Sequence, residues 1–259
     1  MYTLRVINSY GADVTLTGDE NNYQITNITG LEPPQAQVNI SKLAGYDGGI
    51  FNSAQLNVRN LVITIRINGD VEANRIALYQ LFPCGEQVTV RYKNSRINAY
   101  INGYINNISC PIFSNGEIMQ ISIQCPDTFF KSVSDFTKTT AANSNYIEFD
   151  TYSTALYSCL TTINFAGSCT IVSVSSSAGN TNIAYQFQTG DVLKINSERN
   201  NKSIILTRGG TDTDILGELS TTPVFPMIAP GANEFVFTAS TAAAFGSASV
   251  KYTELYGGV

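Results

Sequence analysis

The chain contains no histidine and no tryptophan. Histidine is the side chain that most often exchanges protons near neutral pH, so its absence excludes Ser-His-Asp and Cys-His catalytic arrangements. The chain also has no C-x-x-C pair, and no histidine is available to complete a mixed zinc site. We expect most of its five cysteines to be small buried apolar residues: Cys84, Cys110, Cys125, Cys159 and Cys169. These absences favour a structural role over catalysis.

Charged residues are scarce, at 14% of the chain, compared with about 25% in typical soluble proteins. Much of the surface must therefore consist of amides, hydroxyls and tyrosines, which suits lasting contacts with other proteins. The net charge of −5 gives no basic surface for binding nucleic acid. The one basic cluster, Arg91–Arg96, is more economically explained as a solvated hairpin turn.

The first residues show no basic region followed by an apolar stretch, as a secretory signal would. No uncharged apolar run reaches the roughly 18 to 20 residues that span a bilayer. The sequence therefore predicts a chain that is made and folded in a cytoplasm and that has no membrane anchor.

Alternation of apolar and polar residues dominates the first half and predicts strands at 61–68, 97–105 and 119–125. Between the first two, one amphipathic helix is expected, with Asp70 as N-cap and Pro83 with Gly85 ending it. Residues 30–49 begin with a Pro-Pro pair and end in a glycine-rich turn. They predict a protruding loop or hairpin with a strand at its middle.

The second half predicts short strands separated by turns, without helices, which is typical of a β-sandwich. The expected strands are at 158–163, 169–174, 183–187, 192–196, 203–207 and 234–238, the last preceded by the turn Pro230–Asn233. Because residues 131–146 are polar and aperiodic, the boundary falls there. We therefore predict a mostly β protein with an N-terminal β-sandwich or barrel-like domain carrying one helix at 1–130, a linker at 131–145 and a C-terminal β-sandwich at 146–259.

No group of residues indicates a catalytic, cofactor or metal site. Asp212 and Asp214 form the only close carboxylate pair, but no further calcium ligands follow, so a polar β-turn is the simpler interpretation. A glycosidase, which needs only two carboxylates, is a remaining alternative. It is disfavoured because tryptophan is absent and no acidic residues cluster among aromatic ones.

An ordered set of motifs in the first half resembles the distal tail protein (Dit) family of long-tailed, siphovirus-type bacteriophages. The set runs through the stretches Gly30–Pro34, Gly45–Gly48, "RNLVITIRING", "LYQLFPCG", "QVTVRYKNSR", "INAYINGYINN", a loop to Phe113 and "MQISIQCPDTFF". In the second half, the turn Pro230–Asn233 and the closing residues Tyr256–Val259 are similar to markers of the family's C-terminal sandwich.

The resemblance implies a structural, non-enzymatic protein at the tail tip of a virion, assembled in the host bacterial cytoplasm. Its N-terminal, tail-tube-like domains would close a ring of six copies, with segment 30–49 reaching the adjacent subunit, and DNA would only pass through the channel. Its C-terminal domain would be a galectin-like β-sandwich. The implied partners are the major tail tube protein, the tail-associated hub and tape measure proteins, and a receptor-binding protein.

A binding module is the main alternative, in which the C-terminal sandwich itself grips a glycan on the host surface. Tyrosines that could stack on sugar rings are Tyr146, Tyr152, Tyr157 and Tyr185, although core and interface positions suit them better. At 259 residues, the chain has no room for the inserted carbohydrate-binding module that some family members carry.

Overall fold

The computed structural model describes residues 2–18, 22–45, 47–111, 118–141, 144–219 and 224–259. Tyr46 of the glycine-rich turn, the loop to Phe113, and residues 142–143 and 220–223 lie outside these ranges. The chain divides into two compact units: unit 1 comprises Met1–Val133 with Tyr256–Val259, and unit 2 comprises Ser134–Leu255. The mostly β architecture is confirmed.

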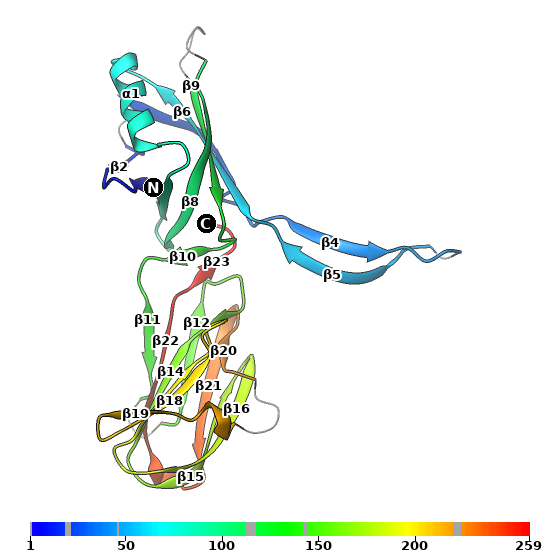
Figure 1. Cartoon of the computed structure of the whole chain (residues 1–259), viewed down its shortest axis with the longest axis vertical. Helices are drawn as coiled ribbons and strands as arrows, with labels where there is room; N and C mark the ends of the chain where they lie inside the picture. Colours follow the sequence, from blue (N-terminus) through cyan, green and yellow to red (C-terminus); the bar gives the residue numbers. More distant parts are fainter. Residues whose placement is uncertain (1, 19–21, 46, 112–117, 142–143, 220–223) are drawn as a thin grey trace. The chain divides into compact units, whose positions relative to one another are not determined.

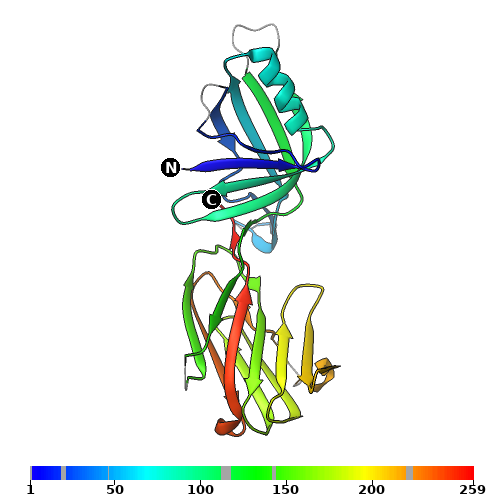
Figure 2. The same ribbon diagram turned by 90° about the vertical axis from the view of Figure 1, so that its left-hand side faces the viewer.

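Unit 1 is built on a nine-stranded sheet whose main path is β2-β1-β7-β8-β9-β6-β3, with β10 beside β8 and β23 beside β10 (Figure 2). The strands are β1 (Thr3–Asn8), β2 (Asp13–Thr15), β3 (Tyr23–Thr29), β6 (Arg59–Ile67), β7 (Gln87–Lys93), β8 (Asn98–Ser109), β9 (Ile118–Cys125), β10 (Phe130–Ser132) and β23 (Leu255–Tyr256). Among the described residues, the main path of the sheet ends at β2 on one side and at β3 on the other. Unpaired edges of this kind must be managed or paired with another chain.

The predicted alternation sets which face of unit 1 is buried. Along β6, Leu61, Ile63, Ile65 and Ile67 are each at most 4% exposed, whereas the residues between them face outward. The predicted helix is α1 (Val71–Leu81), and the Asp70 side chain accepts a hydrogen bond from the N–H of Ala73. Leu78, Leu81 and the following Phe82 pack into the same core.

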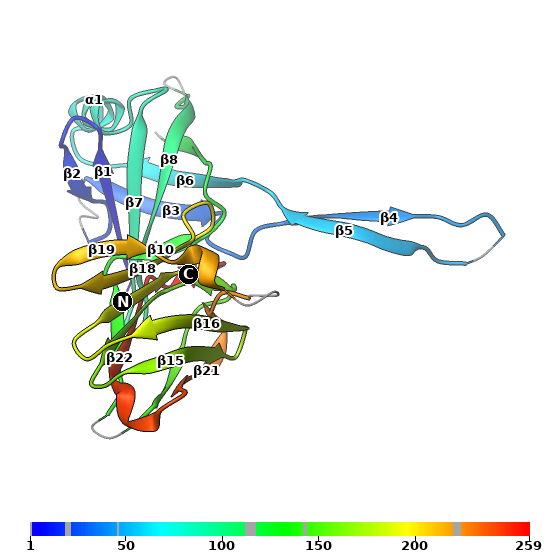
Figure 3. The same cartoon turned by 60° about the horizontal axis from the view of Figure 1, so that its bottom comes forward.

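Unit 2 is a β-sandwich (Figure 3). One sheet has the order β11-β22-β14-β17-β18-β19 and the other β12-β21-β15-β16, with β13 and β20 forming a short separate ribbon. The strands are β11 (Phe136–Thr139), β12 (Tyr146–Thr151), β13 (Tyr157–Ser158), β14 (Leu160–Phe165), β15 (Cys169–Ser176), β16 (Gly179–Phe187), β17 (Val192–Asn196), β18 (Ser203–Arg208), β19 (Thr211–Asp214), β20 (Met227–Ile228), β21 (Gly231–Ala239) and β22 (Phe245–Tyr252). Two 3₁₀ turns lie at Leu216–Glu218 and Ala242–Ala244.

Two parts of unit 2 differ from the prediction. The segment predicted as an aperiodic linker, 131–145, contains the β11 strand, which pairs with β22. Thr211–Asp214, predicted as a polar turn, is the edge strand β19; the turn precedes it at Gly209 and Gly210, which both have positive φ. Gly209 and Gly210 therefore mark the turn of this hairpin, and Asp212 and Asp214 lie in the strand that follows it.

Three of the five thiols are buried, as expected: Cys125, Cys159 and Cys169. Burial raises the pKa of Cys125 to about 12 and that of Cys159 to about 11. Since the thiolate is the reactive form, the raised pKa lowers the reactivity of these two cysteines at neutral pH. Cys84 is exposed and Cys110 is partly exposed.

A buried carboxylate joins the start of β17 to the end of β18 in unit 2. The Asp191 side chain is 1% exposed and accepts two hydrogen bonds from Arg208, at 2.9 and 2.6 Å, and one from the N–H of Gln188 at 2.8 Å. The guanidinium of Arg208 holds the pKa of Asp191 below its ordinary value of 3.8. The carboxylate therefore stabilises the fold above that value, and this contribution is lost as pH falls through the lower folded-state pKa.

We expect Asp191→Asn to lower the free energy of unfolding by about 2 kcal/mol at pH 7, because hydrogen bonds to a charged partner are lost. The difference between the variant and the unaltered chain should shrink as pH falls below 3.8. Urea unfolding at pH 7 and at pH 3 measures both values. Asp212→Asn, at an exposed carboxylate bonded to Thr207, is the matched control and should change little. An equal loss at both pH values for Asp191→Asn would contradict the assignment.

Candidate assembly interface

A two-stranded ribbon leaves unit 1 between β3 and β6 and projects away from the rest of that unit (Figures 1 and 3). It consists of β4 (Ala36–Ser41) and β5 (Ile50–Leu56), and we call residues 35–57 the arm. Every residue of both strands is exposed. A two-stranded hairpin on its own is marginally stable in water, so an uncovered ribbon of this length indicates a surface that becomes covered.

The arm has one apolar face. Ala36 pairs with Leu56, Val38 with Ala54, and Ile40 with Phe51, and residues directly opposite each other lie on the same face of an antiparallel pair. Phe51 and Ile40 are 63% and 60% exposed. Exposed apolar patches of this kind in soluble proteins mark sites of protein contact.

The opposite face of the two strands is uncharged and mostly polar, with Ile50 opposite Ser41 at its far end as the apolar exception. Gln37 pairs with Gln55 and Asn39 with Ser53, and the Asn39 amide donates to the Ser53 hydroxyl at 3.0 Å. An irregularity between Asn39 and Ile40 leaves Asn52 unpaired in the register, and its amide donates to Ser41 at 2.6 Å. No Asp, Glu, Lys or Arg lies in either strand, so a partner surface needs no complementary charge.

The expected excursion at 30–49 is present as a hairpin, but it extends further than the sequence suggested. The second strand, β5, was not anticipated. Ile50 and Phe51 are adjacent apolar residues at the start of β5, next to the irregularity in register. The strand therefore lacks the alternation of apolar and polar residues by which strands are recognised in a sequence. Periodicity does not indicate β5, but cross-strand pairing does. Val38 and Ile40 need apolar side chains opposite them in a hairpin, and β5 supplies these.

The root of the arm is held by Arg59, the first residue of β6, which is 3% exposed. Its guanidinium donates to the backbone carbonyls of Gly30, Glu32 at 2.8 Å, Thr128 at 3.0 Å and Gly257. It also lies 4.8 Å from the centre of the Phe130 ring. Burial lowers the pKa of Arg59 from its ordinary value. Sequence reasoning missed this residue because these hydrogen-bond acceptors all belong to the backbone.

The closing residues Tyr256–Val259, assigned by sequence to the C-terminal domain, pack in unit 1. Tyr256 is 2% exposed within the core of unit 1. The N–H of Val259 donates to the carbonyl of Leu31 at 3.0 Å. A Cβ on Gly258 would lie 3.0 Å from Pro33, so the two backbones approach closely.

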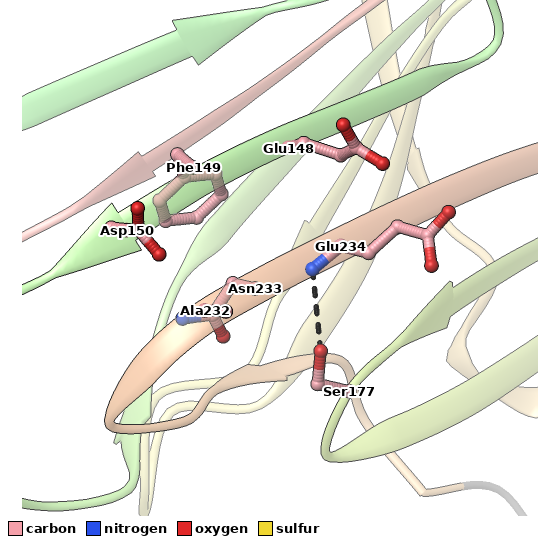
Figure 4. Close-up of a pocket in the computed structure, with 7 residues that line it drawn as sticks. All are labelled: Glu148, Phe149, Asp150, Ser177, Ala232, Asn233 and Glu234. Atoms are coloured by element: carbon pink, nitrogen blue, oxygen red, sulfur yellow. Dashed lines mark hydrogen bonds between the residues drawn. The ribbon is translucent and has the colours of Figure 1, made fainter.

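In unit 2, a shallow pocket lies beside the predicted turn (Figure 4). The turn is closed by Asn233, whose amide accepts from the N–H of Ala229 and donates to the carbonyls of Ala229 and Gly231. Glu148 and Glu234 lie directly opposite each other on β12 and β21, and Asp150 lines the same pocket. Three exposed carboxylates make this surface unfavourable for anionic ligands.

The tyrosines considered for sugar stacking separate into two groups. Tyr157 is buried in the unit 2 core and Tyr185 packs against it, whereas Tyr146 and Tyr152 are 49% and 61% exposed. Asp212 accepts from Thr207 and Asp214 from the N–H of Leu216. Within the described ranges, no three His, Cys, Asp or Glu side chains are arranged to hold a metal ion. Nor does any helix in those ranges have the length and hydropathy needed to cross a bilayer.

Comparisons with known proteins agree with this architecture. Residues 153–256 match the family model of the siphovirus-type tail component, C-terminal domain. The crystal structure of SPP1 Dit (gp 19.1), described as a paradigm of hub adsorption apparatus in Gram-positive infecting phages, superposes with a TM-score of 0.64 at 15% identity, covering 99% of each chain. A chain of the phage P2 baseplate in its activated conformation with Ca gives a TM-score of 0.47 at 12% identity, covering 100% of each chain. No curated protein matches the sequence.

Proposed function

We propose that this chain, whose residues 153–256 match the family model of the siphovirus-type tail component, is a distal tail protein that forms a ring at the tail tip and joins the tail tube to the host-adhesion apparatus. The family consists of structural proteins, so the chain is a virion tail component and not an enzyme. The observation that carries the proposal is the arm, with its exposed apolar face and its two strands that hold no charged residue.

The occupant of the apolar face is a second copy of the chain. The arm projects away from its own unit and covers none of that unit's sheet (Figure 1). When the arm of each copy binds a different surface on the next, the contact is heterologous, and such contacts produce closed rings once the rotation per copy closes. Six copies is the number that the family resemblance implies.

The remaining roles are assigned by unit. Unit 1, with its open sheet edges at β2 and β3, forms the ring and faces the major tail tube protein. Unit 2, a sandwich of galectin-like type, carries the receptor-binding protein, and the tail-associated hub and tape measure proteins adjoin the ring. The chain assembles in the host cytoplasm. Its acidity, with a net charge of −5, suits a channel through which DNA passes without binding.

The mass and shape of the purified full chain test the ring. We expect light scattering to give six times the chain mass of 28.0 kDa, and negative-stain images to show particles with a central channel. A mass of one chain at the highest soluble concentration would remove the proposal. A closed ring with another number of copies would support the proposed ring and replace six by the measured number.

Direct glycan binding by unit 2 is favoured only by the exposed rings of Tyr146 and Tyr152. A glycan array probed with the full chain distinguishes this second function. Saturable binding that is lost when both tyrosines become Ala would establish it, whereas an array without binding leaves unit 2 as a carrier of other proteins.

A further inference from the structure

Among the described residues, the arm is anchored to unit 1 where its two strands begin and end, and the contacts there come from distant parts of the sequence. The segment that leads from β3 into β4 passes through Gly30, Leu31 and Glu32, and the segment that follows β5 leads to Arg59, the first residue of β6. The N–H of Asn57 donates to the carbonyl of Gln35 at 3.0 Å and closes the root. Beyond this point β4 pairs with β5 alone.

From this arrangement we propose that Arg59 and Gly257–Val259 together act as a clamp that sets the direction of the arm. The inference rests on the proposed function of the arm. It assigns to these residues a positioning role in ring closure, although none of them lies in the apolar face that the neighbouring copy covers.

Arg59 joins both ends of the arm through one rigid group. Its planar guanidinium presents hydrogen-bond donors in fixed directions. It donates to the carbonyls of Gly30 and Glu32, which precede β4, while Arg59 itself is the first residue of β6, which follows β5. The same group reaches Gly257. Lysine would keep the charge but present all its donors on a single atom, so it could not hold these carbonyls at once.

Gly257–Val259 forms the other side of the clamp. Val259 donates its N–H to Leu31, and Gly258 lies against Leu31 and Pro33. Leu31 and Val259 are both partly buried against the unit 1 core. The segment before β4 therefore lies between the Arg59 guanidinium and Gly257–Val259, just before the chain leaves the nine-stranded sheet of unit 1.

Small changes at the root have large effects at the tip. Strands rise about 3.3 Å per residue, so the arm extends roughly 25 to 30 Å from its root. A rotation of about 10° there moves the tip by roughly 5 Å, the spacing between neighbouring strands. A ring closes only when each arm meets the next copy at a fixed angle, so the clamp determines closure.

Hydrogen–deuterium exchange on the full chain, diluted to the single-copy form, tests the clamp. The test variants are Arg59→Lys, a chain lacking Gly257–Val259, and Val259→Pro, which removes the N–H donated to Leu31. We expect amides at 29–35 and 56–60 to exchange about tenfold faster in each. Those of β7, β8 and β9 should be unchanged, which shows that the sheet is intact. Arg66→Lys, at an exposed arginine on the same strand, is the control for Arg59, and Val259→Ala is the control for the proline.

Exchange at the root within twofold of the unaltered chain in Val259→Pro and Arg59→Lys, with β7–β9 protected, would overturn the clamp. The measurement is made on single copies, so it does not depend on the ring. If the unaltered chain forms no ring, the proposed function fails while exchange still decides the clamp. If rings form and exchange is unaffected, the clamp alone fails.

Discussion

Replacing Ile40 and Phe51 together by threonine should leave the chain as single copies at concentrations where the unaltered chain forms rings. The two side chains are opposite each other on the apolar face of the arm and are 60% and 63% exposed. Burying each side chain against a neighbour contributes about 1.5 to 3 kcal/mol, so losing both should weaken the contact between two copies by about 10²- to 10⁴-fold. Threonine preserves the strand propensity of the ribbon, so its pairing is retained.

The matched control changes a cross-strand pair on the opposite face, Gln37 and Gln55, to threonine. This variant should assemble as the unaltered chain does, because the residues lie away from the covered surface. Light scattering over a range of concentrations compares the three chains. Equal assembly by both variants would show that the apolar face is not the contact.

Gly30→Ala should destabilise unit 1 by about 3 kcal/mol or more. Gly30 has φ +89°, and a Cβ there would overlap the carbonyl oxygen of Asn60. The backbone of β6 must therefore move, since a carbonyl of a paired strand cannot swing aside as a flexible side chain would. The Gly30 carbonyl is also an acceptor for Arg59, so the same displacement weakens the root of the arm.

Gly11→Ala separates the cost of backbone strain at positive φ from the cost of steric overlap. Gly11 has nearly the same φ, +86°, but a Cβ added there would have no atom within 4 Å beyond its own chain neighbours. The substitution should therefore cost only the backbone strain, about 1 to 2 kcal/mol. Exchange of the slowest amides in β3 and β6 gives the opening free energy for each variant. A loss at Gly30 no greater than at Gly11 would show that unit 1 absorbs the added carbon.

The parts of the fold that were predictable from sequence are those fixed by local patterns. The alternation of β6 and the Asp70 cap of α1 both follow from neighbours in the chain. By contrast, β22, with the sequence "FGSASVKY", buries only Ala248, Val250 and Tyr252. Its small residues give little hydrophobic contrast, and its strand character comes from pairing with β14 and β11.

The candidate site was only half predictable for a similar reason. Pro33, Pro34 and the glycine-rich turn mark an excursion, since turn chemistry is local. The length of β5 depends on a register irregularity, and the role of Arg59 depends on carbonyls from residues 30 to 257. Nothing in an arginine's own sequence neighbourhood distinguishes one that donates to distant backbone from one that is solvated.

The position of Gly257–Val259 in the chain has a consequence for the timing of synthesis. The arm emerges from the ribosome early, but the residues that complete its root follow the whole of unit 2, Ser134–Leu255. At about 5 to 20 residues per second, that interval lasts roughly 6 to 25 s. A nascent chain still on the ribosome therefore displays an arm that is not yet fixed. Under the proposed clamp, the arm therefore acquires its direction only after unit 2 has been synthesised.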